Sequence, residues 1–136
     1  MEAGERVVLD TDVLIDFLRG RESALRLVEE LRRKRCSLAT TAVNVFELSW
    51  GAHKLGGGRI RDVERLASRL LVLGLTVREA LKAGEEAAYL ESLGLAMDVR
   101  DLLIGIIARE NGYAVATGNV KHFTRIRGLQ VIRYER

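Results

Sequence analysis

The sequence has little that would point to an extracellular or membrane protein. Its single cysteine, Cys36, has no second cysteine with which to form a disulfide inside the chain, so nothing favours an oxidising compartment. No apolar run approaches the ~20 residues that a membrane-spanning helix needs. The first residues also lack the apolar core of a signal peptide. We therefore expect a soluble, cytoplasmic protein without a membrane partner.

Several common catalytic signatures are missing as well. The two histidines, His53 and His122, lie far apart in the sequence, and no third ligand accompanies them as a zinc site requires. The glycine run Gly56–Gly58 follows a predicted helix, whereas a phosphate-binding loop follows a strand. No G-x-S-x-G segment is present to form the nucleophile turn of a serine hydrolase. These absences exclude zinc chemistry, nucleotide binding by a P-loop and serine-based hydrolysis.

The composition is that of one ordinary globular domain. Apolar residues make up 48% of the 136 residues and charged residues 30%, and no repeat or linker divides the chain, so we expect a single domain over residues 1–136. The net charge is only +3, but 18 of the 22 basic residues are arginine. Because the planar guanidinium suits phosphate groups, this composition permits a nucleic-acid partner.

Alternating patterns predict an α/β fold. Helical patterns separate short apolar runs that are typical of buried strands. The alternation predicts a five-stranded, mainly parallel sheet flanked by helices. The predicted strands are Arg6–Leu9, Ser37–Ala39, Leu71–Leu73, Tyr113–Ala116 and Val131–Ile132. The predicted helices are one through Phe17, then Glu22–Arg35, Thr41–Lys54, Arg59–Leu70, one from a capping box at Thr76 and Glu79 to Leu93, and one from Asp98 to Asn111.

Four oxygen-bearing side chains are predicted to meet at one edge of this sheet, beyond the carboxyl ends of the strands. Asp10 and Asn119 follow the first and fourth strands, Glu47 lies in the helix after the second strand, and Asp101 lies in the first turn of a later helix. Carboxylates without Cys or His ligands select hard cations such as Mg²⁺ or Mn²⁺. Such an ion activates water and neutralises charge on a phosphodiester, so the pattern favours phosphodiester hydrolysis.

Other interpretations of these acids remain open. Asp10 also suits the N-cap of the next helix, and Asp98, close to Asp101, is better explained as a helix cap than as a ligand. Glu47 needs a polar partner if it is buried among its apolar neighbours. A receiver-like signalling domain is also α/β with acids at one sheet edge, but the acids Asp10 and Asp12 are not adjacent, which fits that class poorly.

Four segments in order resemble the PIN-domain family, specifically its VapC-type toxins. They are LDTDVLIDF, TTAVNVFELSWGA, RDLLIGIIA and VATGNVKHFTRIRGLQV, and the likeness runs from Val7 to Val131. The resemblance implies a three-layer α/β domain that cleaves RNA with Mg²⁺ or Mn²⁺, is inhibited by a cognate antitoxin and forms a homodimer. The alternative is a non-catalytic module of this fold that binds RNA or protein.

The resemblance also implies roles for individual residues. The family's three acids fall on Asp10, Glu47 and Asp101, which would be the metal ligands. A fourth catalytic position, often aspartate, is Asn119 here, with Thr117 in a supporting role. Asparagine brings no charge, which puts a second metal ion in doubt. Gly118 replaces an arginine that is frequent between these two positions.

Two surface features remain open from the sequence alone. Arg61, Arg65 and Arg69 recur every four residues and so line one helical face, which is either a solvated surface or a contact for the RNA backbone. Apolar residues on the first helix, including Leu14 and Leu18, form either part of the core or a surface for a partner protein, because apolar periodicity does not separate the two.

Overall fold

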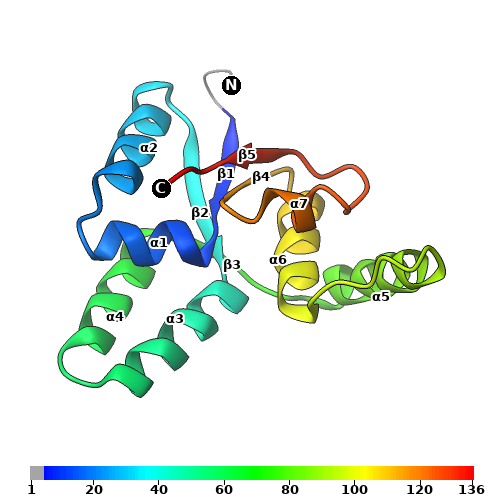
Figure 1. Cartoon of the computed structure of the whole chain (residues 1–136), viewed down its shortest axis with the longest axis horizontal. Helices are drawn as coiled ribbons and strands as arrows, with labels where there is room; N and C mark the ends of the chain where they lie inside the picture. The colour runs from blue at the N-terminus through cyan, green and yellow to red at the C-terminus, as the bar shows by residue number, and fades with distance from the viewer. Residues whose placement is uncertain (1–4) are drawn as a thin grey trace.

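The computed structural model describes residues 5–136, so the first four residues of the expected domain lie outside it. A central five-stranded sheet has the order β3-β2-β1-β4-β5, and each of its four strand pairs is parallel (Figure 1). The expected α/β fold with a mainly parallel sheet is therefore confirmed. The strands are β1 (Arg6–Leu9), β2 (Ser37–Thr41), β3 (Leu71–Leu73), β4 (Ala114–Thr117) and β5 (Val131–Arg133).

Three strands extend further toward the carboxyl edge than the apolar pattern predicted, and one of them, β5, does so by the exposed Arg133. β2 ends at Thr41 and β4 at Thr117. The apolar pattern missed these two residues because they are polar, although both are buried. Their neighbour Thr40 shows how a buried hydroxyl is satisfied, since its Oγ1 donates to the Leu9 carbonyl at 3.0 Å. The extra residues matter for function, because they lie at the edge where the acidic side chains gather.

Helices cover both faces of the sheet, which gives the expected three layers. α1 to α4 lie on one face and α5 to α7 on the other, with α5 extending away from the sheet (Figure 1). Val7 and Leu9 pack toward the first layer, whereas Val8 packs toward the second. The helices are α1 (Thr11–Leu18), α2 (Glu22–Arg33), α3 (Ala42–Leu55), α4 (Arg59–Arg69), α5 (Val77–Ser92), α6 (Val99–Glu110) and α7 (Val120–Phe123).

Capping residues set where most of these helices begin. Thr41 caps α3, Thr76 and Glu79 form the expected capping box of α5, and Asp98 caps α6. The helix α2 ends two residues earlier than expected, and Arg35 just beyond it has a φ of 59° in the left-handed region. The short helix α7 was not anticipated. Within the described part of the chain, no helix has both the length and the apolar character to cross a membrane.

Candidate active site

The strand order brings the ends of three strands side by side. β1 lies between β2 and β4, so Asp10, which follows β1, has Thr41 at the end of β2 on one side and Thr117 at the end of β4 on the other. Ligand sites of parallel sheets lie at this edge, where the strand order changes direction. Asp10 is only 6% exposed, so its carboxylate sits at the floor of the site.

The Asp10 carboxylate accepts three hydrogen bonds. Its Oδ1 accepts from the Thr11 backbone N at 2.8 Å and from Asn44 Nδ2 at 3.0 Å, and its Oδ2 accepts from Thr117 Oγ1 at 2.7 Å. Burial raises the pKa of Asp10 to about 7, although the Thr117 hydrogen bond opposes the rise. The charge of Asp12 and, less strongly, that of Asp101 also raise this pKa. Asp10 is thus a fixed carboxylate whose negative charge is costly without a cation.

Asn44 connects Asp10 to Glu47 and was not singled out from the sequence. It is fully buried, and its Oδ1 accepts from Thr41 Oγ1 at 2.7 Å in the capping box of α3. Its Nδ2 donates both to Asp10 Oδ1 and, at 2.9 Å, to Thr11 Oγ1. The signal for it was the spacing T-x-x-N, a capping box in which asparagine replaces the usual glutamate or glutamine.

Glu47 has the polar partners that its apolar sequence neighbours made necessary. Thr11 Oγ1 donates to its Oε1 at 2.7 Å, and Arg100 Nη1 lies 3.6 Å from its Oε2. Two of the apolar neighbours, Phe46 and Trp50, are half exposed, so Glu47 lies at the boundary between the core and the surface of α3. Thr11 and Arg100 are two more residues that the sequence did not single out.

Asp101 lies in the first turn of α6 and joins the network through Asn119. Asn119 Nδ2 donates to Asp101 Oδ2 at 3.2 Å, and the Asn119 backbone N donates to Thr117 Oγ1 at 2.9 Å. Burial raises the pKa of Asp101, and the charges of Asp98 and Glu47 raise it further. The four predicted catalytic positions and Thr117 therefore belong to one polar network, in which Asn44, Thr11, Thr117 and Asn119 connect the acids.

The other two acids near this edge have mainly structural contacts. Asp98 accepts from the Arg100 backbone N at 2.8 Å and is the N-cap of α6, as the sequence favoured. The backbone hydrogen bond from Arg100 lowers the pKa of Asp98. Asp12 accepts from the backbone N of Val13 and, through its Oδ2, from the backbone N of Gly118, each at 2.8 Å.

The donor set suits a hard cation, but the side chains do not form a closed metal cluster. Over residues 5–136, no three Asp, Glu, His or Cys side chains are close enough together to hold one ion. Asp10, Glu47 and Asp101 nevertheless offer only oxygen atoms. The charge of Asp101 raises the pKa of Asp10, and the charge of Glu47 raises the pKa of Asp101. That combination is typical of sites whose charge a divalent cation balances.

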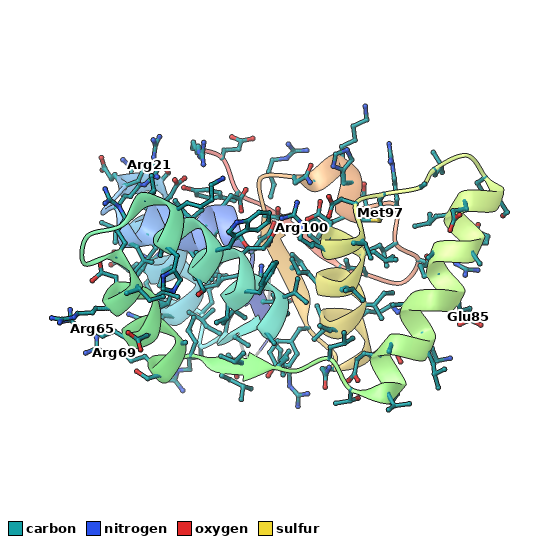
Figure 2. All side chains as sticks on the ribbon, turned by 90° about the horizontal axis from the view of Figure 1, so that it is seen from below. Arg21, Arg65, Arg69, Glu85, Met97 and Arg100 are labelled. Atoms are coloured by element: carbon teal, nitrogen blue, oxygen red, sulfur yellow. The ribbon has the colours of Figure 1, made fainter. Side chains whose placement is uncertain are left out.

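The arginines of α4 do not belong to this network. Figure 2 shows Arg65 and Arg69 projecting from α4 at one edge of the molecule, well away from Arg100 near its middle. Arg61, Arg65 and Arg69 are all exposed, and Arg65 Nη1 lies 3.9 Å from Asp62 Oδ1 of the same helix. Any contact that these arginines make with RNA would therefore lie outside the acidic site.

Curated relatives and solved structures resemble the chain over most of its length. The protein named tRNA(fMet)-specific endonuclease VapC is 28% identical in Salmonella typhimurium over 128 residues, which is 93% of this chain and 96% of the relative. The protein of that name in Shigella flexneri is 26% identical over 127 residues, 92% of this chain and 95% of the relative.

Two solved toxin–antitoxin complexes contain a chain of the same fold. VapBC-1 from nontypeable Haemophilus influenzae matches with a TM-score of 0.81 and 28% identity, over 95% of this chain and 98% of that one. VapBC2 from Rickettsia felis, bound to promoter DNA, matches with a TM-score of 0.86 and 24% identity, over 96% and 99% of the two chains. Residues 7–129 match the PIN domain family, and the chain belongs to this family.

Proposed function

We propose that this protein is an endoribonuclease of the VapC type, the toxin of a toxin–antitoxin pair, which hydrolyses phosphodiester bonds of RNA. One observation carries the proposal: Asp10, Glu47 and Asp101 come from three separate elements and are joined by one hydrogen-bonded network at the carboxyl edge of the sheet. The relatives named as tRNA(fMet)-specific endonucleases make tRNA the substrate class to test first.

Asp10, Glu47 and Asp101 would hold Mg²⁺ or Mn²⁺, on which PIN-domain nucleases generally depend. Burial raises the pKa values of Asp10 and Asp101, which supports the proposal because bound positive charge would offset the cost of ionising them. When bound, such an ion activates a water molecule and neutralises charge that develops on the phosphodiester.

The surrounding polar residues keep the three carboxylates in place. Thr117 and Asn44 each donate to one oxygen of Asp10, so that the carboxylate plane is fixed from both sides. Thr11 holds Oε1 of Glu47, and Asn119 holds Oδ2 of Asp101. Positioned oxygens lose little freedom when a ligand binds, which favours binding of both ion and substrate.

Carboxylate-to-amide variants test this proposal. Purified protein is incubated with total tRNA in Mg²⁺, Mn²⁺ or EDTA, and new RNA ends are mapped. Asp10→Asn and Asp101→Asn should each reduce cleavage by orders of magnitude while the protein stays folded. Glu85→Gln, an exposed carboxylate on α5 (Figure 2), is the matched control and should cleave like the parent. Cleavage by Asp101→Asn at the parent's rate, or cleavage in EDTA, would refute the assignment.

A non-catalytic RNA- or protein-binding module is the second candidate. Asn119, which brings no charge to the fourth position, and the lack of a closed metal cluster among residues 5–136 favour it. The same experiment separates the two functions. A protein that retains tRNA on a filter but produces no new RNA ends with either metal ion would be a binding module.

The proposed protein partner is a cognate antitoxin, and a cleft beside Glu47 is a suitable surface for it. The cleft, about 170 Å³, lies between α1, α3 and α4, and its lining includes Leu18, Leu55 and Val63. Leu14, by contrast, is in the core, so only part of the apolar face of α1 is available to a partner. Leu18→Ser should weaken co-purification of the antitoxin, whereas Leu25→Ser, at a similarly exposed leucine of α2, should not.

The homodimer that the resemblance implies remains a prediction. Val77 and Leu81 are both exposed on α5 and lie one turn apart, which supports a contact between two copies along this helix. Light scattering after gel filtration measures the mass directly. A parent protein of twice the chain mass that becomes monomeric when both residues are changed to serine would support the dimer, and a monomeric parent would contradict it.

A further inference from the structure

Arg100 lies between the acidic site and an exposed aromatic surface. Its Nη1 is 3.6 Å from Glu47 Oε2, and its Nε is 3.4 Å from Asp98 Oδ1. The guanidinium carbon lies 5.6 Å from the centroid of the Trp50 ring, a distance typical of a cation–π contact. The side chain is 39% exposed and, in Figure 2, is seen near the middle of the molecule by α6.

The two oxygens of Glu47 have different partners. Oε1 accepts the hydrogen bond from Thr11 Oγ1, so the oxygen that faces Arg100 is Oε2. A divalent cation that binds Glu47 through Oε2 would therefore compete with the guanidinium for this oxygen. Because two positive groups next to one carboxylate oxygen repel each other, binding of the ion and pairing with Arg100 oppose each other.

Arg100 would stay at the rim of the site after it leaves Glu47. Asp98 accepts from both the backbone N and the Nε of Arg100, and the Trp50 ring lies against its guanidinium. These contacts hold Arg100 at its backbone N and Nε and along one face of the guanidinium, even when the guanidinium no longer pairs with Glu47. The outward N–H groups would then be free for an anion, and a planar guanidinium suits a phosphate with two parallel hydrogen bonds.

We propose that Arg100 is a counter-ion built into the site, which pairs with Glu47 in the metal-free protein and, once a divalent cation binds Glu47, holds a phosphate of the RNA substrate. The proposal rests on the proposed function for the identity of ion and substrate. The proposal adds a coupling between binding of the ion and binding of RNA, because the RNA phosphate gains its contact with Arg100 only when the ion is bound. Arg100 acts here as a positioning residue for the substrate backbone.

Calorimetric titration with Mn²⁺ tests the first half without any cleavage reaction. Arg100→Gln should bind Mn²⁺ about two- to fivefold more tightly than the parent, the range of a partly exposed ion pair. Arg26→Gln, which removes an exposed arginine paired with Glu22 on α2, should leave the affinity unchanged. Equal affinities of Arg100→Gln and the parent, or a parent that binds no Mn²⁺, would overturn the proposal.

A double-mutant cycle separates direct competition from the general effect of removing a positive charge. In a Glu47→Gln background, Arg100 has no carboxylate to hold at that position and affects the remaining site only through its charge near Asp101, so Arg100→Gln should increase the affinity for Mn²⁺ less than it does in the parent. A gain of the same size in both backgrounds would show that Arg100 acts only through the long-range field, and would refute the pairing with Glu47.

Binding of a fluorescent single-stranded RNA tests the second half. In Mn²⁺, Arg100→Gln should flatten the slope of log affinity against log salt by about 0.7, one phosphate contact. In EDTA the two slopes should coincide, because the parent's Arg100 is then engaged with Glu47. A slope difference of the same size in both buffers would make Arg100 an ordinary surface contact.

The outcomes also separate this proposal from the proposed function. If Arg100→Gln changes Mn²⁺ binding in a protein that never cuts RNA, the result would refute the nuclease activity but support the role of Arg100 as a counter-ion.

Discussion

Asp12 Oδ2 accepts a hydrogen bond from the backbone N of Gly118 at 2.8 Å and so ties the start of α1 to the end of β4. A Cβ at position 118 would lie 2.7 Å from this oxygen. The contact explains why glycine replaces the arginine that is frequent at this place in the T-x-N segment. Asp12 and any side chain at 118 compete for the same space, next to Asn119.

Gly118→Ala should disturb this contact and, through it, the position of Asn119. We expect a loss of about 1 kcal/mol in the free energy of unfolding, the usual value of one hydrogen bond, and slower RNA cleavage. Urea denaturation and initial rates measure the two effects. Gly84→Ala is the control: its Cβ would meet nothing within 4 Å on exposed α5, so it should gain up to about 1 kcal/mol. Equal stability of Gly118→Ala and the parent would contradict the interpretation.

Asn119→Asp should increase the affinity for a divalent cation at a cost in metal-free stability. Asn119 Nδ2 now donates to Asp101 Oδ2, and an aspartate would replace this hydrogen bond with repulsion between two carboxylates. We therefore expect tighter Mn²⁺ binding, with a second ion bound, and a lower melting temperature in EDTA. Calorimetric titration that gives the parent's stoichiometry and affinity would refute the role of this position.

Asp98 should matter for stability more than for cleavage. Asp98→Ala removes the N-cap of α6 and should cost about 1 kcal/mol, with little loss of rate per folded molecule. Asp98→Asn keeps an oxygen that can accept from the Arg100 backbone N and should retain most of the stability. A large loss of cleavage at unchanged stability would move Asp98 into the metal site if Mn²⁺ binding weakens with it, whereas the same loss with unchanged Mn²⁺ binding would come from the displaced Arg100.

The raised pKa of Asp10 predicts a pH dependence of stability in EDTA. The unfolded chain loses this proton near pH 3.8 and the folded protein near 7, so between these values the folded state binds more protons. Stability from this group is therefore complete below pH 3.8 and is lost as the pH rises through 7. Asp10→Asn should be more stable than the parent above pH 7, by at most about 4 kcal/mol. Parallel curves of the two proteins from pH 4 to 8 would contradict the shift.

Arg61, Arg65 and Arg69 should contribute to RNA binding only beyond the cleavage site. Changing all three to glutamine should weaken binding of long RNA and flatten its salt dependence, by up to about 0.7 for each lost phosphate contact. The mapped cleavage positions should stay the same, because none of the three arginines contacts the acidic network. The matched control is the same change at Arg26, Arg32 and Arg33, three exposed arginines of α2. An equal salt slope in both triple variants would make the α4 arginines ordinary solvated surface.

Local sequence patterns were sufficient for the order and type of most elements. Each predicted strand is present. A short apolar run such as Val7 to Leu9 is buried on both faces only in a strand that lies between two layers of helices. Capping at Thr76 and Asp98 was predictable for a similar reason, since a cap depends on residues within one helical turn. The positions of Asp10 and Asn119 after their strands also follow from the chain itself.

Contacts between segments far apart in the chain were decided only by the tertiary structure. The sequence by itself gives no reason for Asn44 to bond Asp10 across 34 residues, or for Asp12 to hold Gly118 across 106. These bonds exist because the strand order places the ends of β2, β1 and β4 side by side. Asn44 and Asp10 are also both buried there, so their polar atoms pair with each other rather than with water, whereas the bond between Asp12 and Gly118 is exposed. The pairing of Arg100 with Glu47 arises in the same way, from the packing of α6 against α3.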